Sequence, residues 1–248
     1  MKTDDVEVLR AVRHTRKLRR GTLTGNRFRI VLRDLDGDPA DLEQRLTRLA
    51  AEGVPNYFGE QRFGRAGSNL DTALQLFASP RRRMQRERRS MALSAARSLL
   101  FNRVLSTRVQ AGNWATPIVG DALQLAGSHS FFIASMLDDE MLARARRHDV
   151  HPTGPLYGRG DTPVSGDCLA LEQAVLSAYA PWRDGLEAAG LKQDRRALRL
   201  LASDLEWQQT AEGDWQLQFS LPAGAYATSV LRELIVSTAL PDNPDPPL

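Results

Sequence analysis

Apolar and charged residues alternate near the start of the chain and then change to a helical period. Alternation over residues 27–33 predicts a half-buried strand with Phe28, Ile30 and Leu32 on one face. Leucines spaced as on one face of a helix follow, and they predict an amphipathic helix over residues 41–51. A strand followed so closely by a helix indicates an α+β opening.

The middle of the chain has a mainly helical pattern, with strand patterns on either side of it. Residues 6–13 are predicted to be a strand, and residues 205–207 and 215–221 a hairpin around a polar turn. A loop is expected at 152–166, which holds four glycines and three prolines. The helices are predicted at 69–78, 88–111, 138–148, 167–180, 192–200 and 227–239. This order of elements is typical of a sheet domain interrupted by an inserted domain.

Basic residues are concentrated in two stretches, although the net charge is only +3. Residues 1–33 carry ten Lys or Arg residues against three acidic ones, and residues 81–103 carry eight arginines against Glu87 alone. Arginine pairs with phosphates and stacks on bases, so these stretches are typical of a nucleic-acid surface. Solvated helix faces explain them equally well. Charge alone therefore does not name a partner.

Composition excludes several classes of protein. The content of 42% hydrophobic and 25% charged residues is ordinary for a globular protein, and no apolar run approaches the ~20 residues that cross a bilayer. The polar amino terminus has no apolar signal region and Cys168 is the single cysteine, so we expect a cytoplasmic protein without disulfides. No cysteine–histidine spacing indicates zinc, and His148 and His151 are expected at the surface.

Three segments of the chain carry a resemblance to a known family. They are GNRF at 25–28, GVPNYFGEQRFG at 53–64 and LPAGAYATSVLREL at 221–234. In this order they resemble signature segments of the TruD family of tRNA pseudouridine synthases. The resemblance implies an α+β fold, in which a mixed-sheet catalytic domain is interrupted by a mainly helical insertion. We therefore expect the catalytic domain at 1–51 and 201–248 and the insertion at 52–200.

The resemblance also implies which residues form the uridine pocket. In the family an Asn-x-Phe pair and a later aromatic residue line it, which places Asn26, Phe28 and Tyr226 beside the target base. From the pattern alone, a core position on its strand is the better explanation of Phe28. Arg232 is a candidate for the basic residue that such enzymes pair with an aspartate, although a surface ion pair also explains it.

Basic side chains within the matching segments are expected to contact RNA. Arg62 lies in the segment that joins the two expected domains, where it would contact a phosphate or a neighbouring carboxylate, or serve packing only. His14 is expected to face RNA or to pack, because the chemistry implied by the resemblance needs no imidazole base. The predicted contacts near the start of the chain are Arg13, His14, Arg16, Lys17, Arg19 and Arg20.

The function that the resemblance implies is isomerisation of uridine 13 of tRNA to pseudouridine, without a metal or cofactor. Family enzymes use an aspartate in a Gly-x-Lys-Asp segment ahead of the Asn-x-Phe pair, and no such segment occurs here. We therefore expect the catalytic aspartate upstream of Met1, a chain that is inactive alone, and an unpaired sheet edge prone to aggregation. The expected partner is tRNA and not a membrane, and the complete enzyme is expected to be a monomer. A non-catalytic RNA-binding remnant is the alternative.

Overall fold

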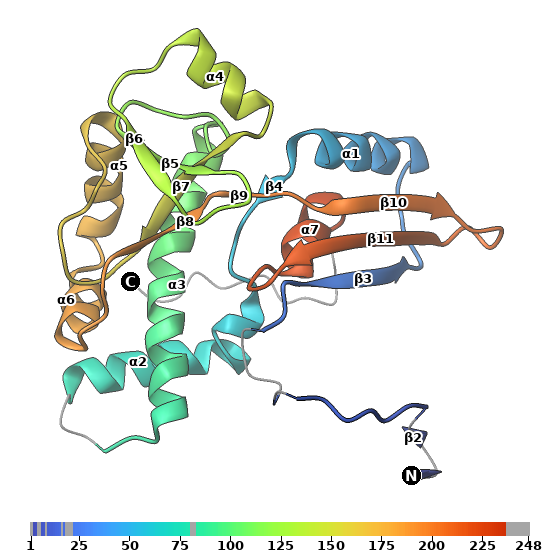
Figure 1. The fold of residues 1–248 in the computed structure, drawn as a ribbon, viewed down its shortest axis with the longest axis horizontal. Coiled ribbons are helices and arrows are strands. Elements are labelled where there is room, and N and C mark those ends of the chain that lie inside the picture. Colours follow the sequence, from blue (N-terminus) through green and yellow to red (C-terminus); the bar gives the residue numbers. More distant parts are fainter. Residues whose placement is uncertain are drawn as a thin grey trace.

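The structure, a computed structural model, describes residues 2–3, 6–7, 9–15, 17, 22–79 and 83–236 (Figure 1). Helices and strands are both abundant, which confirms the expected α+β class. We call residues 25–52 together with 203–234 the sheet region, and residues 54–200 the α3 region. Within the described ranges, no helix is both long enough and apolar enough to cross a membrane.

Strands from opposite ends of the chain form the sheet of the sheet region. It comprises β3 (Gly25–Leu32), β10 (Ser203–Gln209) and β11 (Trp215–Pro222), which are antiparallel in the order β10-β11-β3. The predicted strand and the predicted hairpin are therefore confirmed. As far as the structure describes the chain, β3 pairs with β11 alone, so β3 forms one edge of this sheet.

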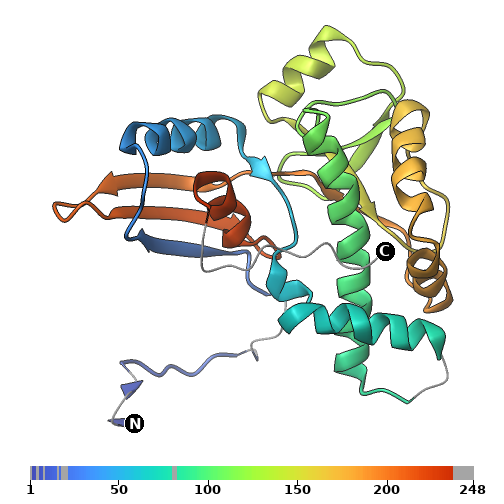
Figure 2. The same ribbon diagram turned by 180° about the vertical axis from the view of Figure 1, so that it is seen from behind.

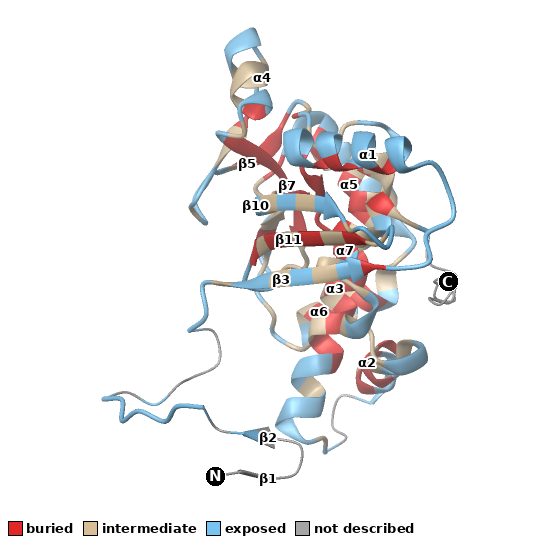
Figure 3. Ribbon diagram, turned by 90° about the vertical axis from the view of Figure 1, so that its right-hand side faces the viewer, coloured by how far each residue is buried: buried red, intermediate tan, exposed pale blue. Residues whose placement is uncertain are grey.

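Helices α1 (Pro39–Glu52) and α7 (Ala227–Leu234) pack on one face of this sheet. The leucines of α1 that were expected to face inward are buried with Leu217 and Phe219 of β11. Asp38 caps α1, because its carboxylate accepts a hydrogen bond of 2.9 Å from the Ala40 amide. Exposed positions alternate along β3 and β10, which leaves the opposite face of the sheet to solvent (Figure 3).

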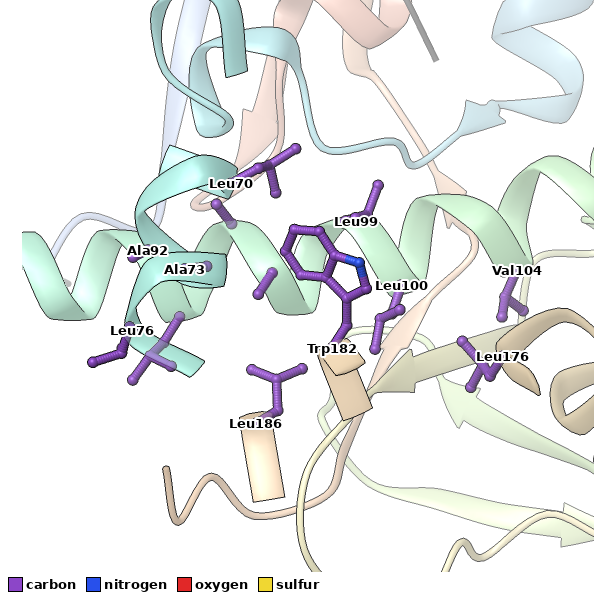
Figure 4. Packing of buried hydrophobic residues seen from close by; sticks show 13 residues of the cluster. Leu70, Ala73, Leu76, Ala92, Leu99, Leu100, Val104, Leu176, Trp182 and Leu186 are labelled. Atoms are coloured by element: carbon purple, nitrogen blue, oxygen red, sulfur yellow. The ribbon is translucent and has the colours of Figure 1, made fainter. Parts of the chain in front are cut away.

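The α3 region is organised by one long helix, α3 (Arg86–Gln110), which runs along its length (Figure 2). Three further helices pack against α3: α2 (Ser68–Ala78), α5 (Gly166–Ser177) and α6 (Ala180–Ala188). Trp182 lies in the centre of their contact, surrounded by Leu70, Leu99, Leu100 and Leu186 (Figure 4). Helical periodicity predicts α2, α3 and α5, but it does not separate α6 from α5.

A second sheet lies in the α3 region, where the sequence predicts mainly helices. Its strand order is β6-β5-β7-β8, all antiparallel, and α4 (Asp139–Arg146) connects β6 to β7, as predicted for a helix at 138–148. The strands are β5 (Asp121–Leu125), β6 (Phe131–Ala134), β7 (Val150–Leu156) and β8 (Asp194–Ala197). This sheet explains two errors of the sequence-based prediction.

The predicted helix at 192–200 and the full predicted loop at 152–166 are both wrong. Residues 194–200 form β8 and β9 (Arg199–Leu200), because pairing with neighbouring strands outweighs a local pattern too short to separate helix from strand. The loop begins only after Leu156, since β7 incorporates Pro152 and Pro155. Prolines are rare inside a central strand, so the composition of this segment argued against the structure that it adopts.

The ends of the described chain are less regular than predicted. Of the strand expected at 6–13, only β2 (Val6–Glu7) forms, paired with β1 (Lys2–Thr3), and residues 9–15 have no regular secondary structure. Apolar side chains in this stretch, such as Leu9, are exposed, so alternation there is not matched by burial. Helix α7 ends at Leu234, short of the predicted residue 239.

The two connections between the sheet region and the α3 region run side by side. β4 (Val54–Pro55) pairs with β9, with Val54 opposite Leu200. Gly53 begins the first connection with a φ of 76°, and a Cβ there would lie 2.6 Å from the Leu200 carbonyl oxygen. Only glycine combines this backbone conformation with so close an approach. The pairing determines where residues 56–64, which follow β4, enter the site described next.

Candidate functional site

A hollow of about 300 Å³ opens where segments far apart in the sequence meet. The loop after β4, the first turn of α2, the N-terminal part of α3 and the residue before α7 each contribute to its wall. The lining residues are Gln61, Arg62, Asn69, Met91 and Tyr226. The hollow therefore combines an aromatic ring, two amides, a thioether and a guanidinium, which together can hold a planar polar ligand bearing negative charge.

Arg62 and Tyr226 are bonded to each other in the wall of the hollow. The Arg62 Nε donates a hydrogen bond of 2.7 Å to the Tyr226 hydroxyl, and its Nη1 donates one of 3.0 Å to Ser94 of α3. The Arg62 guanidinium also lies 5.4 Å from the centre of the Phe58 ring and 5.7 Å from that of Tyr226. These contacts fix the guanidinium in one orientation by cation–π and hydrogen-bond interactions.

Tyr226 is held in place by the loop that resembles the family signature. Its side chain is buried, and its ring meets the Phe58 ring edge to face at 6.1 Å. Gly59 packs against it so closely that a Cβ would lie 2.9 Å from the Tyr226 ring and 2.7 Å from the Thr228 hydroxyl. The absence of a side chain at Gly59 therefore allows the loop to approach the start of α7.

Arg196 of β8 supports the same loop from the other side. Its guanidinium lies 4.1 Å from the centre of the Phe58 ring, and its Nη2 donates hydrogen bonds to the Asn56 side chain at 2.6 Å and to the Gly224 carbonyl at 3.2 Å. Burial lowers the pKa of Arg196 to about 10, and the nearby Arg62 charge lowers it further. Its partial burial thus favours the neutral form, but at neutral pH the guanidinium stays charged.

Neither guanidinium forms an ion pair within the described ranges. Arg62 and Arg196 instead use neutral acceptors and aromatic rings. Two positive charges without a nearby carboxylate create a positive potential in and behind the hollow, which attracts an anionic ligand. The alternative expectation that Arg62 contacts a neighbouring carboxylate finds no support among these residues.

The structure places Asn26 and Phe28 outside the hollow. Phe28 is half-buried on β3 and stacks on Phe219 of β11, with ring centres 5.5 Å apart. Asn26 is exposed on the same face, opposite Leu221. Because Gly25 pairs with Pro222, this end of β3 lies at the start of the turn that leads to Tyr226. The pair is thus close to the hollow along β11, but Phe28 packs in a different hydrophobic cluster from Tyr226.

Arg232 lies on the exposed side of α7, and its contact is aromatic. Its guanidinium is 4.6 Å from the centre of the Tyr57 ring. Burial raises the pKa of Tyr57, while a hydrogen bond with Ser106 and the charge of Arg232 oppose that rise. Of the two interpretations of Arg232, the surface ion pair is not formed within the described ranges, where a cation–π contact replaces it.

The predicted RNA contacts near the start of the chain lie apart from the hollow. Arg13, His14 and Lys17 are exposed on an extended segment that runs away from the body of the molecule (Figure 1). Arg16, Arg19 and Arg20 lie outside the described residues. The structure does not bring this segment to Tyr226, so its contact with RNA stays a prediction.

His151 is buried in β7, so the expectation of two surface histidines is wrong for this residue. Its pKa falls from 6.5 to about 4, chiefly because burial disfavours the imidazolium, and also because Arg199 and His148 lie near it. His148 is only partly exposed, and its pKa is lowered for the same reasons. Among the described residues, no group of three or more His, Cys, Asp or Glu side chains is arranged to hold a metal ion.

Several residues of the site were not found from the sequence. Arg62 and Tyr226 lie in segments that resemble the family, whereas Met91 and Ser94 come from a helix where only periodicity was visible. Arg196 lies in a segment predicted to be a helix, and its register in β8 alone aims it at Phe58. No local pattern could have identified these three, because their contacts depend on how distant elements pack.

Comparison with known proteins gives a consistent result. The family model for tRNA pseudouridine synthase D (TruD) matches residues 1–74 and 68–234. A tRNA pseudouridine synthase D from Nitrosococcus oceani is 55% identical over 93% of this chain, and one from Methylococcus capsulatus is 52% identical over 95%. The chain spans 64% and 66% of the lengths of these relatives.

A solved structure agrees with the fold. It is that of a putative tRNA pseudouridine synthase D from Methanosarcina mazei, which superimposes with a TM-score of 0.63 over 86% of this chain and 69% of that one. Its sequence identity of 21% supports the fold alone. The family model and the curated relatives, which match most of the chain, establish the lineage: the chain belongs to the TruD family of tRNA pseudouridine synthases.

Proposed function

We propose that this chain carries the base-binding part of a tRNA pseudouridine synthase that acts on uridine 13 of tRNA. The observation that carries the proposal is the hollow beside Tyr226, which joins an aromatic ring to two amides and a guanidinium. An aromatic ring supports stacking of an extruded base, and the polar groups can bond to its edge or its phosphate. Membership of the TruD family supplies the reaction class.

The proposed reaction exchanges one bond of the nucleoside for another. The N1–C1′ bond breaks, the uracil turns, and a C5–C1′ bond forms; C5 loses a proton and N1 gains one. No oxidant, reductant or further group is consumed. We assign Tyr226 to the wall of the pocket that stacks on the base, and Asn26 and Phe28 to a second wall at the neighbouring end of the sheet. A pocket closed to water keeps the detached uracil bound until it recombines.

The catalytic carboxylate is the part that these residues do not supply. No Asp or Glu is among the residues that line the hollow, as far as the structure describes the chain. We propose that a segment outside these 248 residues provides it, with Arg232 as its basic partner, and that these residues alone bind RNA without isomerising it. The exposed edge of β3 is available for pairing with such a segment.

Further parts of the proposal concern organisation and surroundings. We propose that residues 1–51 and 201–248 form the catalytic domain and residues 52–200 the insertion. The separate hydrophobic clusters of the sheet region and the α3 region support this division. Phosphate contacts are assigned to Arg62 and, near the start of the chain, to Arg13, His14, Arg16, Lys17, Arg19 and Arg20. The complete enzyme acts as a cytoplasmic monomer in this proposal.

Release of tritium from tRNA labelled at C5 of uridine tests the reaction, because C5 loses its hydrogen only when the new bond forms. The 248-residue chain is expected to release none, whereas the Nitrosococcus oceani synthase serves as the positive control. The same labelled tRNA is titrated with the chain at about 50 and 200 mM salt. Binding is expected to weaken steeply between these concentrations, because phosphate contacts release counterions.

The outcomes separate the alternatives. Tritium release by the chain alone would contradict the proposal that its carboxylate comes from elsewhere. Binding without release, persisting when the amino-terminal portion of the Nitrosococcus oceani synthase is added, would favour a non-catalytic RNA-binding module. Failure to bind tRNA even at low salt would contradict both the synthase and the module.

A further inference from the structure

We propose that one face of α3, continuous with the hollow, holds the phosphates of the RNA strand that adjoins the bound base. This inference rests on the proposed function and extends it to a specific surface. We define the α3 track by Arg65, Arg88, Met91 and Ser94. Met91 lines the hollow, and Ser94 accepts the hydrogen bond from Arg62.

Helical geometry places the members of the track in a row. Arg88, Met91 and Ser94 are spaced three residues apart, so their side chains lie on the same face of α3, about 4.5 Å apart along its axis. Arg88 is exposed, and Met91 exposes 52% of its surface. Arg65 is exposed on the loop between the lining residues Arg62 and Asn69. Positive charge therefore flanks the hollow on the helix and on the loop.

These arginines are not explained by the stability of the fold. Arg65, Arg86, Arg88 and Arg89 form no ion pair with any carboxylate in the described part of the chain. Arg86, Arg88 and Arg89 lie in the first turn of α3, where the helix dipole disfavours positive charge. Glu87 is the only acidic residue between Arg83 and Ser94. A polyanion that crosses this surface would supply the missing negative charge.

The exposed thioether of Met91 argues for an RNA strand rather than an isolated anion. It lies between the arginine of the track and the hollow, and its apolar surface is open to solvent. A nucleotide offers an apolar base face for such a surface and a phosphate for the neighbouring guanidinium. The strand would thus place one base against Tyr226 and lead its neighbouring phosphates past Met91 to Arg88 and Arg65.

The test uses neutral substitutions on the track and a matched one elsewhere. Arg65→Gln and Arg88→Gln remove charge without adding repulsion, and Gln is an acceptable helix residue. Arg146→Gln is the control, because Arg146 is also an exposed helical arginine without an ion pair in the described part, on α4, away from the N-terminal end of α3 (Figure 1). Binding of a tRNA transcript and of a short single-stranded oligoribonucleotide is measured against salt.

The double variant R65Q/R88Q is expected to bind both RNAs on the order of tenfold more weakly or worse at physiological salt. The slope of log affinity against log salt should fall by about 0.7 for each lost contact to a single strand. R146Q should leave both quantities unchanged. Equal melting temperatures of the variants show that the loss is not caused by unfolding.

Two results would overturn the inference and leave the proposed function intact. In the first, the wild-type chain binds tRNA with a clear salt dependence, but the double variant keeps the same affinity and slope. In the second, R146Q loses as much as the track variants, which would indicate a general charge effect. If the wild-type chain binds neither RNA, the proposed function itself fails, and the α3 track fails with it.

Discussion

The sheet region and the α3 region differ in what they bury. The core of the sheet region is a cluster of apolar side chains that includes Leu46, Leu217 and Phe219. The α3 region has an apolar cluster as well, but it also buries the ion pairs Arg108–Asp121 at 2.9 Å and Arg195–Glu172 at 2.7 Å. Apolar burial is not directional, whereas a buried ion pair stabilises a fold only if its geometry and hydrogen bonds are complete.

The buried ion pairs hold irregular segments of the α3 region in place. Arg108 on α3 also donates hydrogen bonds to the carbonyls of Asn113 and Thr116 in the loop that precedes β5. Arg195 of β8 bonds to the Thr153 carbonyl of β7 as well as to Glu172. In this region, polar side chains position the loops and the second sheet around α3. The comparison teaches that the two regions should respond differently to the loss of charge and the loss of apolar volume.

The largest effect is expected for Asp121→Ala, which leaves the Arg108 guanidinium buried without its charged partner. The free energy of unfolding should fall by about 3–5 kcal/mol. Urea unfolding followed by circular dichroism measures it. The control is Asp41→Ala, which breaks an exposed ion pair with Arg45 on α1 and should cost less than about 1 kcal/mol. Similar costs for the two substitutions would refute the proposed dependence on buried charge.

Loss of apolar volume in the sheet region is expected to have a somewhat smaller effect. Leu46 is fully buried between α1 and the sheet, and Leu46→Ala should reduce the free energy of unfolding by about 3 kcal/mol through lost burial and a cavity. Leu46→Met keeps the volume and should cost less than about 1.5 kcal/mol. The same urea measurement applies. A Met variant as unstable as the Ala variant would show that shape rather than volume governs this core.

A pH dependence is expected from His151 in the α3 region. Its folded-state pKa of about 4 lies below the unfolded value of 6.5, so the unfolded state binds the proton first as the pH falls. The stability that this residue contributes is complete above pH 6.5 and decreases as the pH falls toward 4, by about 1–2 kcal/mol after allowance for solvent screening. His151→Gln should lose less stability over this range. Parallel pH profiles of the two proteins would contradict the assignment.

The smallest effect is expected for Tyr226→Phe at the hollow. It removes the hydroxyl that accepts a hydrogen bond from Arg62, while the ring and the Ser94 contact remain. The cost should be about 1 kcal/mol, and tRNA affinity should stay within about threefold because the ring and the guanidinium both persist. Thermal melting and the tRNA titration measure these quantities. A large loss of binding without loss of stability would mean that the hydroxyl contacts RNA directly.

Prediction from the sequence succeeded where apolar period and burial agree. The alternation in β3 and the leucines of α1 describe one sheet face and the helix on it, and both are buried as expected. It failed for β7 and β8, which contain prolines and arginines that local patterns assign to loops and helices. There the partners of the polar groups lie on other strands and on α5, so no window of sequence contains the information.

The candidate site divides in the same way. The matching segments identified Arg62 and Tyr226 without any structure, because the loop and the start of α7 resemble family signatures. Their hydrogen bond, the contribution of Met91 from α3 and the support of Phe58 by Arg196 were not visible. Each of these contacts joins residues at least 29 positions apart, from Arg62 to Met91, and some join opposite ends of the chain.

The sequence by itself determined the α+β class, the elements with a clear apolar period and the membership of the TruD family, because these depend on local composition and on segments read in order. Only the tertiary structure decided that residues 121–200 contain a sheet, that β3 forms an edge, and that Arg62, Met91 and Tyr226 share one hollow. Strand pairing and side-chain contacts are interactions between distant residues, so their energies appear only when the chain is folded.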